Sequence, residues 1–219
     1  ILLGLAGATV NIAALMGAMA AIAVVFLVSY RAADWNLYRL LLTGVLLSAG
    51  FGAAISLLLS LAPSAAVKGM LFWLMGDLSQ AEGVLPAWVA LGLATGIGVV
   101  FGGSLNVLSL GHAKAATLGV AVGPLQLAVY FGASLVTATA LMVGGAIGFV
   151  GLVIPHAIRL MGITDYRYLI PAAVLLGGGF LALADTLARV LWAPKQLPVG
   201  VLTALLGVPV MLALLSRRA

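Results

Sequence analysis

Long apolar runs, separated by short groups of charged and turn-forming residues, constrain this chain more than any other feature. A helix needs about 20 apolar residues to cross the hydrocarbon core of a bilayer. Runs of that order occupy residues 8–30, 39–61, 84–104, 124–160 and 168–191, and a last run ends before Arg217. The run at 124–160 accommodates two helices if the chain turns near Gly144. The pattern therefore predicts an all-α, polytopic transmembrane helical bundle with about seven spans.

The composition excludes most soluble classes of protein. Hydrophobic residues make up 64% of the 219 residues and charged residues only 7%, whereas soluble domains carry roughly a quarter charged residues. The bilayer is therefore the expected solvent. The net charge of +5 comes from Lys and Arg scattered singly, which form no patch for the phosphates of a nucleic acid. Because the chain has no cysteine, disulfides and Cys-based metal or redox sites are excluded.

The positions of the basic residues predict the orientation in the membrane. With seven spans, seven of the ten Lys and Arg residues fall on one side. Cytoplasmic loops carry the excess of Lys and Arg, so the C-terminus is predicted to be cytoplasmic. The seven are Arg31, Arg39, Lys114, Arg159, Arg167, Arg217 and Arg218, against Lys68, Arg189 and Lys195.

Three motifs in the second half of the chain resemble one family of transporters. They are Gly-Phe-Val-Gly-Leu-Val-Ile-Pro-His at 148–156, Ala-Asp-x-x-Ala-Arg at 184–189 and Leu-Pro-Val-Gly-Val-Leu-Thr-Ala at 197–204. Weaker matches lie at 39–44 and 72–76. Together they are similar to the permease subunits of bacterial ABC importers for iron-siderophores, heme and vitamin B12. Residues 1–219 are accordingly expected to form a single permease domain, the C-terminal part of a subunit with about ten helices.

The resemblance implies a set of partners and a location. Such permeases are homodimers or paired paralogues in the bacterial inner membrane, with two cytoplasmic ATPase subunits and an extracytoplasmic substrate-binding protein. The permease is not an enzyme and binds no cofactor, because the partner ATPase uses the ATP and magnesium. In agreement, the sequence has no Gly-rich phosphate loop followed by Lys and Ser or Thr. Which substrate is carried is left open.

Residues 105–123 match the family's cytoplasmic coupling segment, which folds as short helices that sit in a groove of the ATPase. The match is Leu-Gly-x-x-x-Ala-x-x-Leu-Gly, and His112 stands where the family commonly has an acidic residue. The resemblance assigns ATPase coupling to Leu110, Gly111, His112, Ala113, Lys114, Ala115, Leu118 and Gly119.

The resemblance also implies a docking site on the outer face. Basic residues at the outer mouth of these permeases receive acidic residues of the binding protein, and Arg189 occupies one such position, with Lys195 nearby. Asp185 and Arg189 are four residues apart and share one helix face, so they are expected to pair. Asp185 is given a structural role.

Two further groups receive weaker assignments. Asn36, Leu37 and Tyr38 fall where the family narrows the pathway, and they are candidates for a cytoplasmic gate or an ordinary interfacial Tyr. Pro155 and His156 are interpreted as structural, with His156 capping or hydrogen-bonding at a helix end. Glycines at 44, 50 and 52, and at 92, 96 and 98, are expected to mark closely packed helix faces.

Two other classes of function compete with the importer. A gradient-driven secondary transporter needs an intramembrane carboxylate or broken helices near the midplane, whereas the five acidic residues here fall in loops or near span ends. An intramembrane enzyme needs a nucleophile–base pair or a metal site, and no such pattern is visible.

Overall fold

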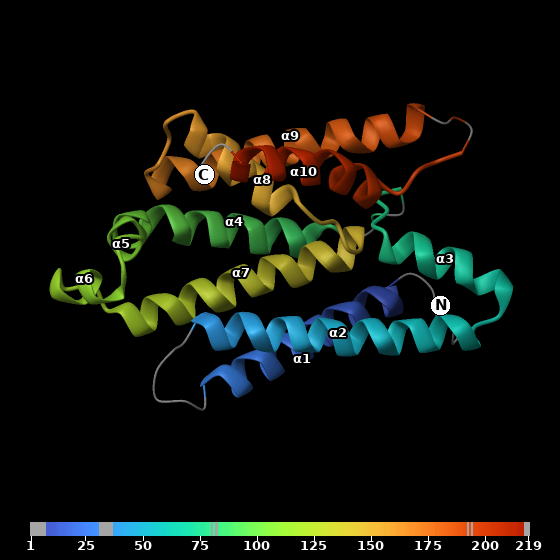
Figure 1. Cartoon of the computed structure of the whole chain (residues 1–219), viewed down its shortest axis with the longest axis horizontal. Coiled ribbons are helices and arrows are strands. Elements are labelled where there is room, and N and C mark those ends of the chain that lie inside the picture. Colours follow the sequence, from blue (N-terminus) through green and yellow to red (C-terminus); the bar gives the residue numbers. More distant parts are fainter. Residues whose placement is uncertain are drawn as a thin grey trace. The chain divides into compact units, whose positions relative to one another are not determined.

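The protein is all-helical, as predicted. The computed structural model describes residues 8–30, 37–79, 81, 83–191, 193 and 195–216, and this part contains no strand. Ten helices follow one another along it (Figure 1). They are α1 (Ala8–Tyr30), α2 (Leu37–Leu61), α3 (Ser64–Leu74), α4 (Leu85–Val100), α5 (Gly102–Leu108), α6 (His112–Thr117), α7 (Val122–Gly144), α8 (Val150–Leu160), α9 (Tyr166–Val190) and α10 (Val199–Ser216).

The chain divides into two compact units, Ile1–Leu74 and Met75–Ala219. In the first unit, α1 and α2 pack against each other and α3 follows α2 after the Pro63 turn. Their apolar residues run around the whole circumference, with Leu41, Val45 and Leu57 largely exposed. Helices that are apolar on every side are typical of a membrane environment.

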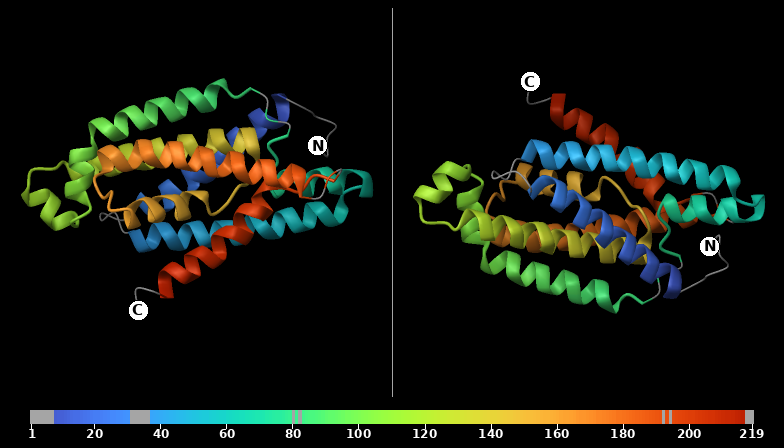
Figure 2. Two further views of the ribbon diagram at one scale, coloured as in Figure 1. Left: turned by 90° about the horizontal axis from the view of Figure 1, so that it is seen from above. Right: turned by 90° about the horizontal axis from the view of Figure 1, so that it is seen from below.

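The second unit is built around α4 and α9. Helix α4 packs against α7 and α9, and α9 also contacts α8 and α10 (Figure 2). Ile154 and Ile158 of α8 meet Leu169 of α9 in a buried apolar cluster. Helices α7, α8, α9 and α10 run in alternating directions. Helices α5 and α6 lie at one end of this unit, and α10 starts at the other end (Figure 1).

The polytopic helical bundle is confirmed, and fewer of its described helices than the expected seven spans are individually long enough to cross a membrane. Four described helices are long and apolar enough to cross a membrane, and a fifth crossing arises only if α4 and α5 count as one bent span. These two helices meet at 68°, so the predicted run at 84–104 bends at Phe101. Helix α8 has 11 residues and extends only about 16 Å. The predicted turn after α7 is present at Gly145, but residues 145–149 are not helical.

Most of the glycines expected at packed faces have open space where a side chain would stand. A Cβ at Gly44, Gly50, Gly52, Gly92 or Gly96 would meet no atom within 4 Å. Gly98 is the exception, because a Cβ there would lie 2.7 Å from Cδ1 of Ile170. Glycine spacing alone does not distinguish a face packed within the chain from one that is open.

Candidate functional site

The predicted coupling segment forms two short helices joined by a glycine that no other residue replaces easily. Helix α5 starts after the Phe101 bend, and α6 begins after Gly111, whose φ of 107° and ψ of 154° lie in a region almost restricted to glycine. The expectation of short helices in 105–123 is confirmed. Their role in coupling stays a prediction.

The side chains of the coupling segment separate into an outer and an inner face. Leu110 and Leu118 are 59% and 63% exposed, whereas Ala115 is completely buried. The residues at 111–114 and at 119 are exposed as well. A substitution at Ala115 would therefore disturb how α6 is seated, and only the exposed residues are available to a partner.

Helix α6 is joined to α7 by one polar contact. The side-chain nitrogen of Gln126 lies 2.8 Å from Nε2 of His112 and donates to it when that ring nitrogen is unprotonated. His112 therefore has an intramolecular partner in the place where the family commonly has an acidic residue.

Helix α5 is tied to the beginning of α9 by an arrangement that the sequence did not reveal. Asn106 donates from Nδ2 to Oδ1 of Asp165 at 2.8 Å, and its own Oδ1 accepts from the backbone N–H of Tyr166 at 2.9 Å. Oδ1 of Asp165 also accepts from the backbone N–H of Arg167 at 2.9 Å, so Asp165 is the N-cap of α9. We call Asn106, Asp165 and the first turn of α9 the α5–α9 clamp.

The clamp carboxylate stays charged at neutral pH. The hydrogen bond from Asn106, followed by that from the Arg167 backbone, lowers the pKa of Asp165 below its ordinary value. Since the folded-state pKa is the lower one, the stability gained is present above the ordinary carboxylate range and is lost as the pH falls through the lowered pKa. The clamp is therefore insensitive to pH around neutrality.

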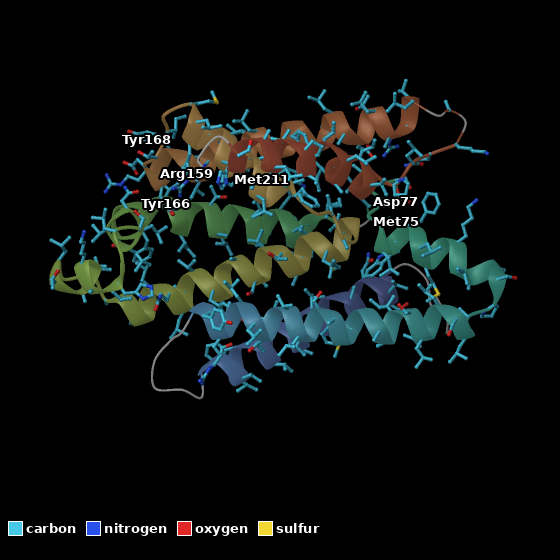
Figure 3. All side chains as sticks on the ribbon, in the orientation of Figure 1. Met75, Asp77, Arg159, Tyr166, Tyr168 and Met211 are labelled. Carbon is cyan, nitrogen blue, oxygen red and sulfur yellow. The ribbon has the colours of Figure 1, made fainter. Side chains whose placement is uncertain are left out.

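A second contact strengthens the same end of the unit. Arg159 of α8 donates to the hydroxyl of Tyr166 at 2.9 Å, and its guanidinium lies 5.4 Å from the centre of that ring. Figure 3 shows Arg159, Tyr166 and Tyr168 together at this end. Lys114 of α6 and Arg167 of α9 also belong to this end of the second unit, and its position on the cytoplasmic side stays a prediction.

At the other end, three segments meet, which we call the junction: the non-helical residues 75–78 and 145–149, and residues 197–200, where α10 begins. The backbone N–H of Asp77 donates to the carbonyl of Gly144 at 3.0 Å, and that of Val199 donates to the carbonyl of Gly76 at 3.1 Å. Figure 3 labels Met75 and Asp77 there. These bonds give two backbone N–H groups of the junction partners within the protein.

Glycines allow the junction to close. A Cβ at Gly200 would overlap the backbone oxygen of Met75 and lie 3.1 Å from that of Ala146. A Cβ at Gly207 would lie 2.5 Å from Cβ of Phe149, which has a positive φ of 66°. The segments at 72–76, 148–156 and 197–204, found separately by their motifs, thus converge in one place.

The expected pair at the far end of α9 is confirmed. Nε of Arg189 donates to Oδ2 of Asp185 at 2.8 Å, and the two side chains are 48% and 20% exposed. Lys195 is exposed in the following loop. Arg189 is therefore accessible at the end opposite the coupling segment, while its docking role stays a prediction.

The Asp185–Arg189 pair itself is expected to contribute little to stability. Exposed pairs of this spacing contribute about 0.3–0.5 kcal/mol. Asp185→Asn should therefore shift thermal unfolding by less than the error of most assays, whereas a shift of several degrees would show that the pair holds α9 in place.

The remaining site predictions have mixed outcomes. Asn36 lies outside the described residues, Leu37 is the first residue of α2, and Tyr38 is 73% exposed. His156 lies inside α8, which ends at Leu160 with Met161 as its C-cap, and its structural role stays a prediction. Its side chain is half-buried. Pro155 also lies inside α8.

The described residues hold no cluster of three His, Asp or Glu side chains that could bind a metal ion. Three polar contacts of the second unit meet at the α5–α9 clamp. The sequence gave no sign that Asn106, in the predicted coupling segment, and Asp165, in the loop 59 residues further on, meet. The one local signal was Asp165 itself, because Asp is a preferred N-cap residue at the start of a helix.

The sequence profile of the FecCD transport family matches residues 1–217. This chain belongs to that family. Among relatives, it is 39% identical over 213 residues to an uncharacterized ABC transporter permease protein, YvrB, of Bacillus subtilis, covering 95% of this chain and 59% of the relative. It is 38% identical to the hemin transport system permease protein HmuU of Yersinia pestis, covering 94% and 62%.

A solved structure agrees with this family assignment. It is described as an inward-facing conformation of a metal-chelate type ABC transporter, and it matches with a TM-score of 0.83 and 31% identity over 95% of this chain and 71% of that one. The chain thus spans about three fifths of the length of the curated FecCD relatives it matches.

Proposed function

We propose that this chain belongs to the membrane-spanning permease subunit of an ATP-driven importer for a metal chelate, heme or cobalamin. The observation that carries the proposal is the exposed α5–α6 segment, which lies at one end of the helical unit and presents Leu110 and Leu118. Membership of the FecCD family and the names of the relatives support it. The end with α5 and α6 is then cytoplasmic, as is the C-terminus.

The chain itself carries no machinery for ATP hydrolysis in this proposal. Two ATPase subunits would bind the α5–α6 end and use ATP and magnesium, and a second permease subunit would complete the pathway. An extracytoplasmic binding protein would dock at the opposite end, where Arg189 is exposed.

Uptake by the reconstituted permease tests this function. The complete permease is placed in proteoliposomes with and without its candidate ATPase, and entry of hemin, cobalamin and an iron chelate is measured. We expect uptake of one of these ligands only with both the ATPase and ATP. Uptake without the ATPase, driven by an ion gradient, would contradict the proposal and favour a secondary transporter.

Arg189 provides a test of the outer face. We expect Arg189→Glu to slow association with the binding protein by about tenfold at low salt, because charge complementarity acts mainly on the association rate. Surface plasmon resonance at two ionic strengths measures the association rate. Asp185→Asn is the matched control, because it keeps the positive charge of Arg189. An unchanged association rate in Arg189→Glu would remove this residue from the docking surface.

A further inference from the structure

Helix α5 has weak backbone connections to its neighbours. It meets α4 at the 68° bend, and it is separated from α6 by Gly111 with its positive φ. Neither connection is a continuous helix, so a force applied to α5 and α6 would be absorbed by backbone rotation unless side chains hold α5 to another element.

The α5–α9 clamp supplies that hold with both ends of one amide. Nδ2 of Asn106 donates to Asp165, and Oδ1 of Asn106 accepts from the backbone N–H of Tyr166. Two of the N–H groups that a helix start leaves unpaired are thus satisfied within the clamp, one by Asn106 and one by Asp165. Breaking the clamp would leave the start of α9 without these partners.

Close packing aligns the two helices at the same point. A Cβ at Gly102 would lie 2.6 Å from Cγ and 3.0 Å from the backbone nitrogen of Arg167, and one at Gly103 would lie 2.8 Å from Nη2 of that residue. The first turn of α9 therefore rests directly on the backbone of α5. Displacement of α5 toward α9 would push that turn.

The first turn of α9 depends on these contacts more than an ordinary helix start does. Pro171 lies inside α9 and has no N–H to donate to the carbonyl of Arg167. The turn before it is consequently less firmly joined to the remainder of α9. Its position is set by what it touches, which is α5, Asn106 and Arg159.

We propose that Asn106 is a positioning residue that fixes the coupling segment to the first turn of α9, so that a partner that moves α5 moves α9 with it. This inference rests on the proposed function, since the partner is the ATPase. In this inference, motion passes from the ATPase to the helical bundle through the side chains of the α5–α9 clamp and not through the backbone of the α4–α5 bend.

Transport measurements with Asn106→Ala test the link. In proteoliposomes with the ATPase and binding protein, we expect ATPase binding within about twofold of wild type, because the exposed residues of α5 and α6 are unchanged, while substrate transported per ATP falls about tenfold, a typical coupling between sites. Asp165→Asn should retain most transport, since its amide oxygen still accepts from Asn106 and Arg167. Thr137→Ala, which removes a hydrogen bond within α7, is the control.

Hydrogen exchange on the permease alone tests the clamp without the ATPase. Asn106→Ala should speed exchange of the Tyr166 amide, which loses its acceptor, about tenfold and leave the amides in the middle of α7 unchanged. Unchanged exchange, or exchange increased throughout the protein, would overturn the clamp as described.

The two assays distinguish failure of the inference from failure of the function. If wild type binds the ATPase and Asn106→Ala transports as much per ATP, the inference is wrong and the importer function stands. If wild type never binds an ATPase, both are wrong, even when the amide exchange behaves as expected.

Discussion

Replacing Leu110 and Leu118 together with Glu is expected to lower the affinity for the ATPase by about 100-fold or more. The two leucines are among the exposed apolar side chains of the coupling segment, and burying each against a partner contributes roughly 1.5 kcal/mol or more. The two Glu carboxylates would be buried without partners where the leucines contact the ATPase, and this opposes binding. Co-purification with the candidate ATPase, followed by titration in nanodiscs, measures the loss.

The matched control for this pair is Leu110→Met with Leu118→Met. It keeps the volume and the apolar character of both side chains, so binding should stay within about tenfold of wild type. If the Glu pair binds the ATPase as tightly as wild type, the α5–α6 segment is not the docking surface. Normal expression and exchange of the Glu pair would show that it folds.

The second large effect is expected from Gly200→Ala. The added methyl group would overlap the backbone oxygen of Met75 and approach that of Ala146, and backbone atoms cannot rotate out of the way as a side chain can. The first turn of α10 would have to move and strain the Val199–Gly76 hydrogen bond. We expect destabilisation of about 3 kcal/mol, at the upper end of overpacking effects, seen as a lower thermal unfolding midpoint and less monodisperse protein.

Gly92→Ala in α4 is the control for this variant. A Cβ at Gly92 meets nothing within 4 Å of the described chain, and Ala is favoured over Gly in a helix by up to about 1 kcal/mol. Gly92→Ala should therefore fold at least as well as wild type. If Gly200→Ala unfolds at the same temperature as Gly92→Ala, the tight junction does not contribute to stability as described.

Helices bounded by charged or turn-forming residues were predictable from the sequence. The runs at 8–30, 39–61 and 168–191 became α1, α2 and α9 with ends shifted by at most two residues. Length and apolarity suffice for such helices, because in a bilayer each must satisfy its own backbone hydrogen bonds. The family was also predictable, because its motifs are local.

Segments that depend on their neighbours were not predictable. The run at 84–104 is as apolar as a full span, yet it bends at Phe101 because α5 packs against the first turn of α9. Similarly, α8 begins only at Val150, because residues 145–149 are non-helical and pack at the junction. The length of an apolar run therefore does not predict where a helix ends when contacts with another segment set that end.

By itself, the sequence determined that this protein is a bundle of apolar helices and which family it belongs to. These properties follow from local composition and spacing. Only the tertiary structure decided that Asn106 meets Asp165 and that Gly200 closes on Met75. Both contacts join segments far apart in the chain, and the free energy of such a contact depends on two positions that no local pattern connects.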